Sequence, residues 1–271
     1  MPHLQLSELP QLPTLLLDSP LDGLLRVQLN RPAVANAINT QMGQDIIDVF
    51  GAMEAEPDAF RCVLLTGAGN KVFCAGADLK ERNGMADEDF NIQHYVFERM
   101  NRAIYDCPVP TIACVNGPAI AGGLELALAC DFILASDNAR FGFTEVTRGI
   151  MPGGGGTQQL PRAIGIRKAK ELIFTGESID VEQALACGLI NHVYAQDELL
   201  TQAMKLIEKI LANAPISIRQ AKKSITFGSQ MDLRTGMFFE IEAYSRLVAT
   251  QDRNEGILAF NEKRAPRFKG K

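Results

Sequence analysis

The segment from Gly122 to Cys130, GGLELALAC, constrains the fold most, because Glu125 is its only polar side chain. A helix that is apolar on every side is normally buried. A buried carboxylate needs a partner, water or a ligand, since isolated burial of a charge is too costly. Burial also raises the pKa of a carboxyl, which suits proton transfer near neutral pH. The segment therefore predicts a buried helix with a functional acid, and a solvent-facing stripe is the alternative.

A second acid, Glu145, follows the run FGFT, which favours a short strand or loop. Glycines flank both acids, at 122–123 and at 153–156. An ordinary loop acid is the alternative interpretation of Glu145. Two acids in apolar, glycine-rich surroundings indicate a candidate site more strongly than either acid alone.

Composition excludes several classes of protein. The chain has 271 residues, a hydrophobic share of 46% and a net charge of −5. Lys and Arg are dispersed until the C-terminal tail, which argues against nucleic acid as the main ligand. No apolar stretch approaches the length that spans a bilayer, so no membrane partner is expected.

The six cysteines form no CxxC pair, and the three histidines form no HExxH motif. Reduced thiols and the absence of a metal site are therefore expected. The N-terminus contains acids and lacks an early Arg, so it fits neither a secretory signal nor a transit peptide. We predict a cytoplasmic location.

Strand-type and helix-type segments alternate in the first two thirds of the chain, which predicts an α/β fold. The final third is predicted to be helical. The predicted divisions are an N-terminal arm over 1–20, a core over 21–200 and a helical region over 201–271. The main predicted strands cover 24–29, 61–66, 111–116 and 132–135, and the main early helices cover 42–53, 90–106 and 122–130.

Glycine-containing loops suggest where a ligand approaches the backbone. TGAGNKV at 66–72 lacks the third glycine and the helix of a dinucleotide site. The run 153–156 lacks the Lys and Ser/Thr of a phosphate loop, so we interpret it as a flexible turn before a helix at Thr157. FCAGAD at 73–78 and AGG at 121–123 instead offer backbone N–H groups that could converge on one oxygen. Two ordinary turns are the alternative.

These features together resemble the enoyl-CoA hydratase/isomerase (crotonase) superfamily over nearly the whole chain after residue 20. The resemblance is strongest for hydratases that carry both glutamates, and for methylglutaconyl-CoA hydratases in particular. The matching motifs are NRPAVANAI from Asn30, FCAGADLKE from Phe73, PVPTIACVNGPAIAGGLELALACD from Pro108, ARFGFTEVTRGIMPGGGGTQQLPR from Ala139, and DRNEGILAFNEKRAPRF from Asp252.

The resemblance implies a superhelix of ββα units whose helical C-terminal region makes trimers, or hexamers built from two trimers. It also implies an acyl-CoA substrate and no separate cofactor, because CoA is part of the substrate. Glu125 and Glu145 match the catalytic glutamates, and the N–H groups of Ala75 and Gly122 would form the oxyanion hole. The residues implied to bind CoA are Ala35, Ala37, Ile38, Ala75, Gly76, Ala77, Asp78, Leu79, Gly122, Phe260 and Lys263.

The implied reaction is hydration of an α,β-unsaturated thioester, with Glu145 as proton donor to C2 and Glu125 as activator of water. Short-chain enoyl-CoA hydration and double-bond isomerisation are alternatives, and the two glutamates favour hydration. Arg148 departs from short-chain hydratases, and we hypothesise that it pairs with a dicarboxylic acyl chain; a surface ion pair is the alternative. RNA binding is disfavoured, because Thr40 to Arg61 has no lysine and five acids.

Overall fold

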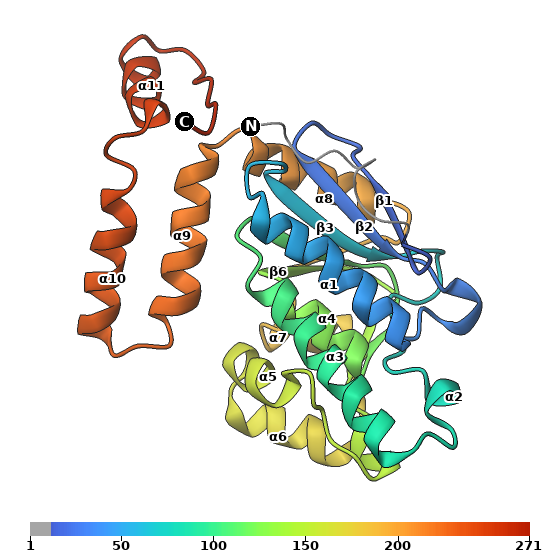
Figure 1. Ribbon diagram of the computed structural model, residues 1–271. Helices are drawn as coiled ribbons and strands as arrows, with labels where there is room; N and C mark the ends of the chain where they lie inside the picture. The colour runs from blue at the N-terminus through green and yellow to red at the C-terminus, as the bar shows by residue number, and fades with distance from the viewer. Residues whose placement is uncertain (1–11) are drawn as a thin grey trace.

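The computed structural model describes residues 12–271, with helices on both faces of a large β-sheet and a helical C-terminal region (Figure 1). The strands are β1 (Leu15–Asp18), β2 (Leu24–Leu29), β3 (Cys62–Gly67), β4 (Thr111–Val115), β5 (Ala119–Ile120), β6 (Phe132–Ser136), β7 (Arg140–Gly142), β8 (Ser178–Asp180) and β9 (His192–Tyr194). The α-helices are α1 (Thr40–Ala55), α2 (Leu79–Arg82), α3 (Asp87–Tyr105), α4 (Gly122–Ala129), α5 (Gly156–Ile164), α6 (Ile166–Thr175), α7 (Val181–Ala186), α8 (Leu199–Leu211), α9 (Pro215–Gly228), α10 (Leu233–Ser245) and α11 (Gln251–Asn261). The 3₁₀ turns are η2 (Pro32–Val34) and η3 (Glu145–Arg148). The predicted α/β fold with a helical final part is confirmed.

The larger sheet has the strand order β1-β2-β3-β4-β6-β9, and all its neighbouring strands are parallel except β1 and β2. Every residue of β3 is buried. Its side chains alternate between two layers: Val63 and Leu65 join the apolar cluster that contains α1 and α3 residues, whereas Leu64 joins the cluster that contains α8 residues. Burial on both faces explains why these strands are continuous apolar runs.

The predicted N-terminal arm over residues 1–20 is wrong for its last part, because residues 15–18 form β1. This strand pairs antiparallel with β2, from Leu15 opposite Leu29 to Asp18 opposite Arg26. Leu15 is buried, and the preceding Thr14 donates both its backbone N–H and its hydroxyl to the buried Asp45 of α1. The short run of leucines was therefore a sheet edge. Residues 1–11 of the predicted arm lie outside the described residues.

The predicted division at residue 201 also needs correction, because α8 belongs to the core. Leu199, Ala203 and Ile207 are buried against Leu64 and neighbouring residues of the large sheet. A spacing of three or four residues places these side chains on one helix face. The helices that extend away from the core are α9, α10 and α11 (Figure 1).

A smaller sheet with the strand order β5-β7-β8 positions the two glutamates. β5 and β7 are parallel neighbours, with Ala119 opposite Phe141 and Ile120 opposite Gly142. Helix α4, with Glu125, begins two residues after β5, and η3 begins with Glu145 three residues after β7. The carboxyl ends of parallel strands lie at the same edge, so the sheet brings these two acids to one place.

Helices α9 and α10 run side by side in opposite directions, and α11 follows at the end of α10 (Figure 1). Two ion pairs attach α9 to the core: Arg219 pairs with Asp58 at 2.6 Å and Lys222 with Asp131 at 2.8 Å. Helix α10 instead leaves large apolar side chains exposed. These are Leu233, Met237, Phe238, Ile241 and Tyr244.

Replacing Ile207 by Ala tests whether α8 is part of the core. Ile207 is fully buried, so we expect Ile207→Ala to lower the free energy of unfolding by about 2–5 kcal/mol, measured by urea denaturation. The matched control is Ile92→Ala, because Ile92 on α3 is 57% exposed. Equal effects of the two substitutions would contradict the assignment of α8 to the core.

Candidate active site

A cavity of about 350 Å³ lies beside α3, α4 and η3, and both glutamates line it. The loop before α2 contributes Ala77, the start of α4 contributes Gly122, and the glycine run contributes Gly153 and Gly154. The other lining residues are Ile38, Leu79, Arg82, Phe90, Asn91, His94, Phe97, Met100, Asn101, Ala121, Thr144, Arg148, Ile150 and Met151. The structure therefore brings Glu125 and Glu145 together, as the sequence predicted.

Glu125 is buried but well supplied with hydrogen bonds. One carboxylate oxygen, Oε1, accepts the backbone N–H groups of Gly154 at 2.7 Å and of Gly156 at 2.8 Å. Burial raises the pKa of Glu125 above its ordinary value, and the two N–H donors partly offset this rise because they stabilise the ionised form. Glu125 is thus a buried carboxyl whose charged form has dedicated donors.

Glu145 occupies a different environment. Its side-chain Oε2 atom is buried and has no hydrogen-bond partner among the described residues. Burial, together with the nearby charge of Glu125, raises the pKa of Glu145 to about 7, and a backbone hydrogen bond and the charge of Arg148 partly oppose this rise. The two acids thus share one cavity but differ in their hydrogen-bonding surroundings, which is a condition for different proton affinities.

The glycine run 153–156 is a close-packed clamp, so the interpretation of it as a flexible turn was wrong. A Cβ atom on Gly154 would lie 2.4 Å from Asn101 Nδ2 and 2.7 Å from Glu125 Oε2. A Cβ atom on Gly156 would lie 2.6 Å from the ring of Phe143. Glycine is required here because the backbone must approach the carboxylate closely, and helix α5 begins at Gly156 rather than at Thr157.

The predicted use of Ala75 as an oxyanion donor is wrong. Its N–H group donates to the carbonyl oxygen of Ala35 at 3.1 Å. The extended segment continues with Ile38 N–H donating to Gly76 O and Asp78 N–H donating to Ile38 O. In extended chain the direction of successive N–H groups alternates, so the N–H of Ala77 points away from Ile38.

Ala77 and Gly122 supply the unused pair of donors. Among residues 12–271, neither N–H group donates a hydrogen bond, and both residues line the cavity. They lie close together, because a Cβ atom on Gly122 would be 3.7 Å from Ala77 N. Gly122 therefore stays a candidate donor, and Ala77 replaces Ala75 as the second candidate donor.

Ala121 holds this arrangement in an unusual backbone conformation. It has φ 53° and ψ −126°, in a region that side-chain-bearing residues rarely occupy. Its own N–H donates to Gly142 O at 2.8 Å, so strand β7 fixes the turn from which α4 starts. Strain of this kind costs on the order of 1–3 kcal/mol and is concentrated at functional sites.

The remaining residues predicted to bind CoA have varied positions. Ile38 and Leu79 line the cavity, whereas Ala35, Ala37 and Gly76 do not. Asp78 pairs with Arg31 at 2.9 Å and caps α2 through the N–H groups of Lys80 and Glu81. Its carboxylate is therefore committed to holding this loop in shape.

Phe260 and Lys263 do not line the cavity. Phe260 is 83% exposed on α11, which Figure 1 shows at the opposite end of the molecule from α2. Their contact with a neighbouring subunit's CoA stays a prediction.

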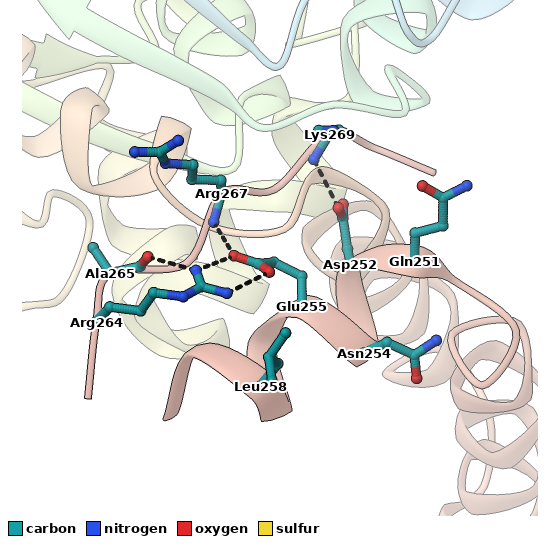
Figure 2. A pocket seen from close by; sticks show the side chains of 9 residues that line it. All are labelled: Gln251, Asp252, Asn254, Glu255, Leu258, Arg264, Ala265, Arg267 and Lys269. Carbon is teal, nitrogen blue, oxygen red and sulfur yellow. Dashed lines mark hydrogen bonds and ion pairs between the residues drawn. The ribbon is translucent and has the colours of Figure 1, made fainter. Parts of the chain in front are cut away.

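A larger hollow of about 790 Å³ lies beside α11 (Figure 2). Glu255 pairs there with Arg264 and accepts the backbone N–H of Arg267, and Asp252 accepts the N–H groups of Lys269 and Gly270. These contacts fold the C-terminal tail back onto α11. Both acids of this larger hollow, Asp252 and Glu255, already accept hydrogen bonds from the chain. The smaller cavity, with the unused N–H groups of Ala77 and Gly122, is therefore the better candidate site.

One face of α3 also lines the cavity, which no sequence pattern had indicated. Asn91, His94 and Asn101 line the cavity from this helix, and Arg82 lines it from the end of α2. The Oδ1 atom of Asn101 is buried without a partner among the described residues. The helical spacing of Phe90, His94, Phe97 and Asn101 could have indicated one shared face, but it did not show that this face meets Glu125.

The described residues were also searched for metal sites, disulfides and membrane-spanning helices. No group of His, Cys, Asp and Glu side chains in residues 12–271 has the arrangement of a metal site. The six cysteines are unpaired, and five are buried. Within the same residues, no helix combines the length and apolar character needed to cross a bilayer.

Known proteins share this fold and sequence. The model of the enoyl-CoA hydratase/isomerase family matches residues 21–271. The Bacillus subtilis protein YngF, named for that activity, is 44% identical over 244 residues, which cover 90% of this chain and 94% of the relative. The mitochondrial methylglutaconyl-CoA hydratase of Mus musculus is 40% identical over 252 residues, which cover 92% of this chain and 80% of the relative.

The crystal structure of an enoyl-CoA hydratase from Bacillus anthracis superposes with a TM-score of 0.93 at 42% identity, covering 95% of this chain and all of the other. This likeness confirms the predicted crotonase-like fold. The match of the family model runs from the second strand of the large sheet to the C-terminus and includes both glutamates. The chain belongs to the enoyl-CoA hydratase/isomerase family of enzymes.

Proposed function

We propose that the protein adds water across the double bond of an α,β-unsaturated acyl-CoA thioester. One observation carries the proposal: two buried carboxyls with different hydrogen bonding line the same cavity as two unused backbone N–H groups. Hydration needs these four groups, because it requires an activated water, a proton for C2 and stabilisation of the thioester oxygen. The family acts on acyl-CoA thioesters, which supports this substrate class.

The backbone donors are assigned to the thioester carbonyl. Negative charge grows on its oxygen as the water oxygen bonds to C3, and the N–H groups of Ala77 and Gly122 stabilise that charge. Such donors are effective because they are already in place and cost no reorganisation. Removing one donor in other enzymes costs roughly 3–4 kcal/mol in the activation barrier.

The glutamates are assigned different parts according to their surroundings. Glu125 is held ionised by Gly154 and Gly156 and takes a proton from the water. Glu145, whose pKa is about 7, is largely protonated below that pH and delivers its proton to C2. The water oxygen ends on C3 and a hydrogen on C2. Because both carboxyls line one cavity, we expect them to reach one face of the double bond, and therefore syn addition. CoA is part of the substrate, and no other cofactor enters these steps.

The acyl chain is the finer part of the proposal. Relatives of about 40% identity carry different names, among them methylglutaconyl-CoA hydratase. We propose methylglutaconyl-CoA, an intermediate of leucine degradation, as the first substrate to test. A short-chain enoyl-CoA is the second candidate, and double-bond isomerisation, which needs only one base, is the third.

Conservative removal of each glutamate tests the assignment. We expect Glu125→Gln and Glu145→Gln each to lower the hydration rate of crotonyl-CoA and methylglutaconyl-CoA by about 10²–10⁴-fold, measured as loss of enoyl-thioester absorbance. The control is Glu171→Gln, which changes an exposed acid on α6. If the wild-type protein folds and binds CoA but hydrates neither thioester, the hydratase proposal fails and isomerisation remains.

Glu145 should reduce stability at neutral pH, because its pKa is about 7 in the folded protein and about 4.5 when solvated. Below pH 4.5 both states hold the proton, and the carboxyl has no charge penalty. As pH rises from 4.5 to 7, the unfolded state loses its proton first, so folding stability falls. We therefore expect Glu145→Gln to raise the melting temperature at pH 8 more than at pH 5. A difference that shrinks with rising pH would contradict this explanation.

We also propose that the protein forms a trimer, or a hexamer of two trimers, through its C-terminal region. The exposed apolar row on α10, which includes Phe238, Ile241 and Tyr244, supports this assignment. Exposed apolar surface of this extent marks an interaction site. A cytoplasmic location stays a prediction, since the relatives include both mitochondrial and bacterial proteins.

Mass measurement by light scattering tests the assembly. We expect the wild-type protein at three or six times its 29.6 kDa chain mass, and Phe238→Glu combined with Ile241→Glu at a lower mass, because buried unpaired charges oppose association. Lys205→Glu on α8 is the control for added negative charge. A monomeric wild-type protein would contradict the proposal.

A further inference from the structure

Arg82 is a half-buried cation without an acidic partner. Its side chain lines the same cavity as Glu125 and Glu145. No ion pair joins it to a carboxylate within residues 12–271. The only hydrogen bond of its side chain within these residues runs from Nε to Gln93 Oε1 at 2.7 Å, so the two terminal nitrogens of the guanidinium are unused. A partly desolvated guanidinium with free donors is a ready-made anion site.

A buried network holds the guanidinium in place. Gln93 is 2% exposed, and its amide nitrogen donates to Thr40 Oγ1 at 2.8 Å and to Glu81 Oε2 at 2.7 Å. The carboxylate of Glu81 also accepts the backbone N–H of Thr40. Glu81 is therefore engaged with α1 and α3, and it orients Gln93, which in turn orients Arg82.

Two aromatic rings fix the other side of Arg82. Its guanidinium carbon lies 4.5 Å from the ring centre of Phe90 and 5.3 Å from that of Phe97. Both rings belong to α3 and line the cavity. Contact with ring faces replaces part of the lost hydration of the cation but leaves the hydrogen-bonding edge of the fork free.

Arg148, which the sequence analysis singled out, is less suited to bind an anion. It is exposed, and its Nη1 donates to the Thr147 hydroxyl at 3.0 Å and to Thr144 O at 3.4 Å, within its own turn. The wall that Arg82 shares also carries the polar side chains of Asn91 and His94. An alkyl chain bound against this wall would leave the guanidinium and these polar groups without hydrogen-bond partners, which costs binding free energy.

We propose that Arg82 is a specificity-determining residue that binds a carboxylate on the acyl chain of an enoyl-CoA substrate. This inference rests on the proposed hydratase function and extends it to a substrate class, namely enoyl thioesters that end in a carboxylate. The planar fork of Arg82 matches a carboxylate in two parallel hydrogen bonds. Gln93, Phe90 and Phe97 act as positioning residues for the fork.

Two thioesters of equal carbon number test the proposal. Glutaconyl-CoA carries a terminal carboxylate, and trans-2-pentenoyl-CoA has a methyl group in its place. We expect the wild-type protein to have the higher kcat/KM for glutaconyl-CoA. In Arg82→Gln, kcat/KM for glutaconyl-CoA should fall about 10–100-fold, the range for a hydrogen-bonded charged contact, while that for trans-2-pentenoyl-CoA stays within about threefold.

Matched variants separate this role from others. Arg102→Gln removes an exposed arginine of α3 that pairs with Glu98, and it should leave the ratio of the two kcat/KM values unchanged. Arg82→Lys keeps the charge without the fork and should retain part of the preference. If Arg82→Gln does not fold, the wild-type ratio and Arg82→Lys still decide the matter.

Each contrary outcome has a distinct meaning. An equal fall for both thioesters in Arg82→Gln would show that Arg82 binds the CoA portion or supports the fold, and would overturn the proposal. A wild-type preference for trans-2-pentenoyl-CoA would also overturn it. If the wild-type protein hydrates neither thioester, the hydratase function itself fails.

Discussion

The parallel pairing of β5 and β7 is the constraint on which the site depends. These strands are only two and three residues long, yet the segments that follow them carry Glu125 and Glu145. The loop at 73–77 lies beside β5, because Cys74 forms an isolated parallel β-bridge with Ala119 and the N–H of Ile120 donates to Cys74 O. Three segments that are distant in sequence thus end at one edge, where two acids and two free N–H groups meet around one cavity.

Burying two carboxyls in one cavity opposes folding, and the structure treats the two acids unequally. Glu125 receives two backbone donors from the glycine run 153–156, whereas Glu145 has a buried oxygen that finds no donor within residues 12–271. Burial raises the pKa of both acids, and only for Glu125 do two glycine N–H groups oppose the rise. A site that supplied donors to both acids would be more stable, but it would lose the protonated member that the proposed reaction needs.

Patterns with a strong local cause could be predicted from the sequence. The buried helix at 122–130 and the buried strands were predicted correctly, because burial requires apolar residues throughout such segments. The burial of Glu125 and Glu145 was predicted from their apolar neighbours. Ala75 was wrong by two positions, since only the pairing with Ile38 decides which N–H of an extended loop stays free. The clamp at 153–156 and the role of α8 also depend on partners far along the chain. Arg82 was not predicted, because an arginine near the end of a short helix resembles an ordinary surface residue in sequence. Only the structure shows that it lines the cavity and forms no ion pair within residues 12–271.

One half of the cavity is lined mainly by backbone groups, and the other half mainly by side chains. The half that would perform the chemistry consists largely of backbone groups, at Ala77, Gly122, Gly154 and Gly156. At Gly154 and Gly156 the surrounding atoms leave no room for a larger side chain. The other half consists of side chains from α2 and α3, whose identity can change without altering the backbone pairing. Chemistry is therefore tied to the fold, whereas acyl preference is tied to a few side chains. If the proposed function holds, the α2–α3 wall is therefore where we expect the acyl preference of this protein to be determined.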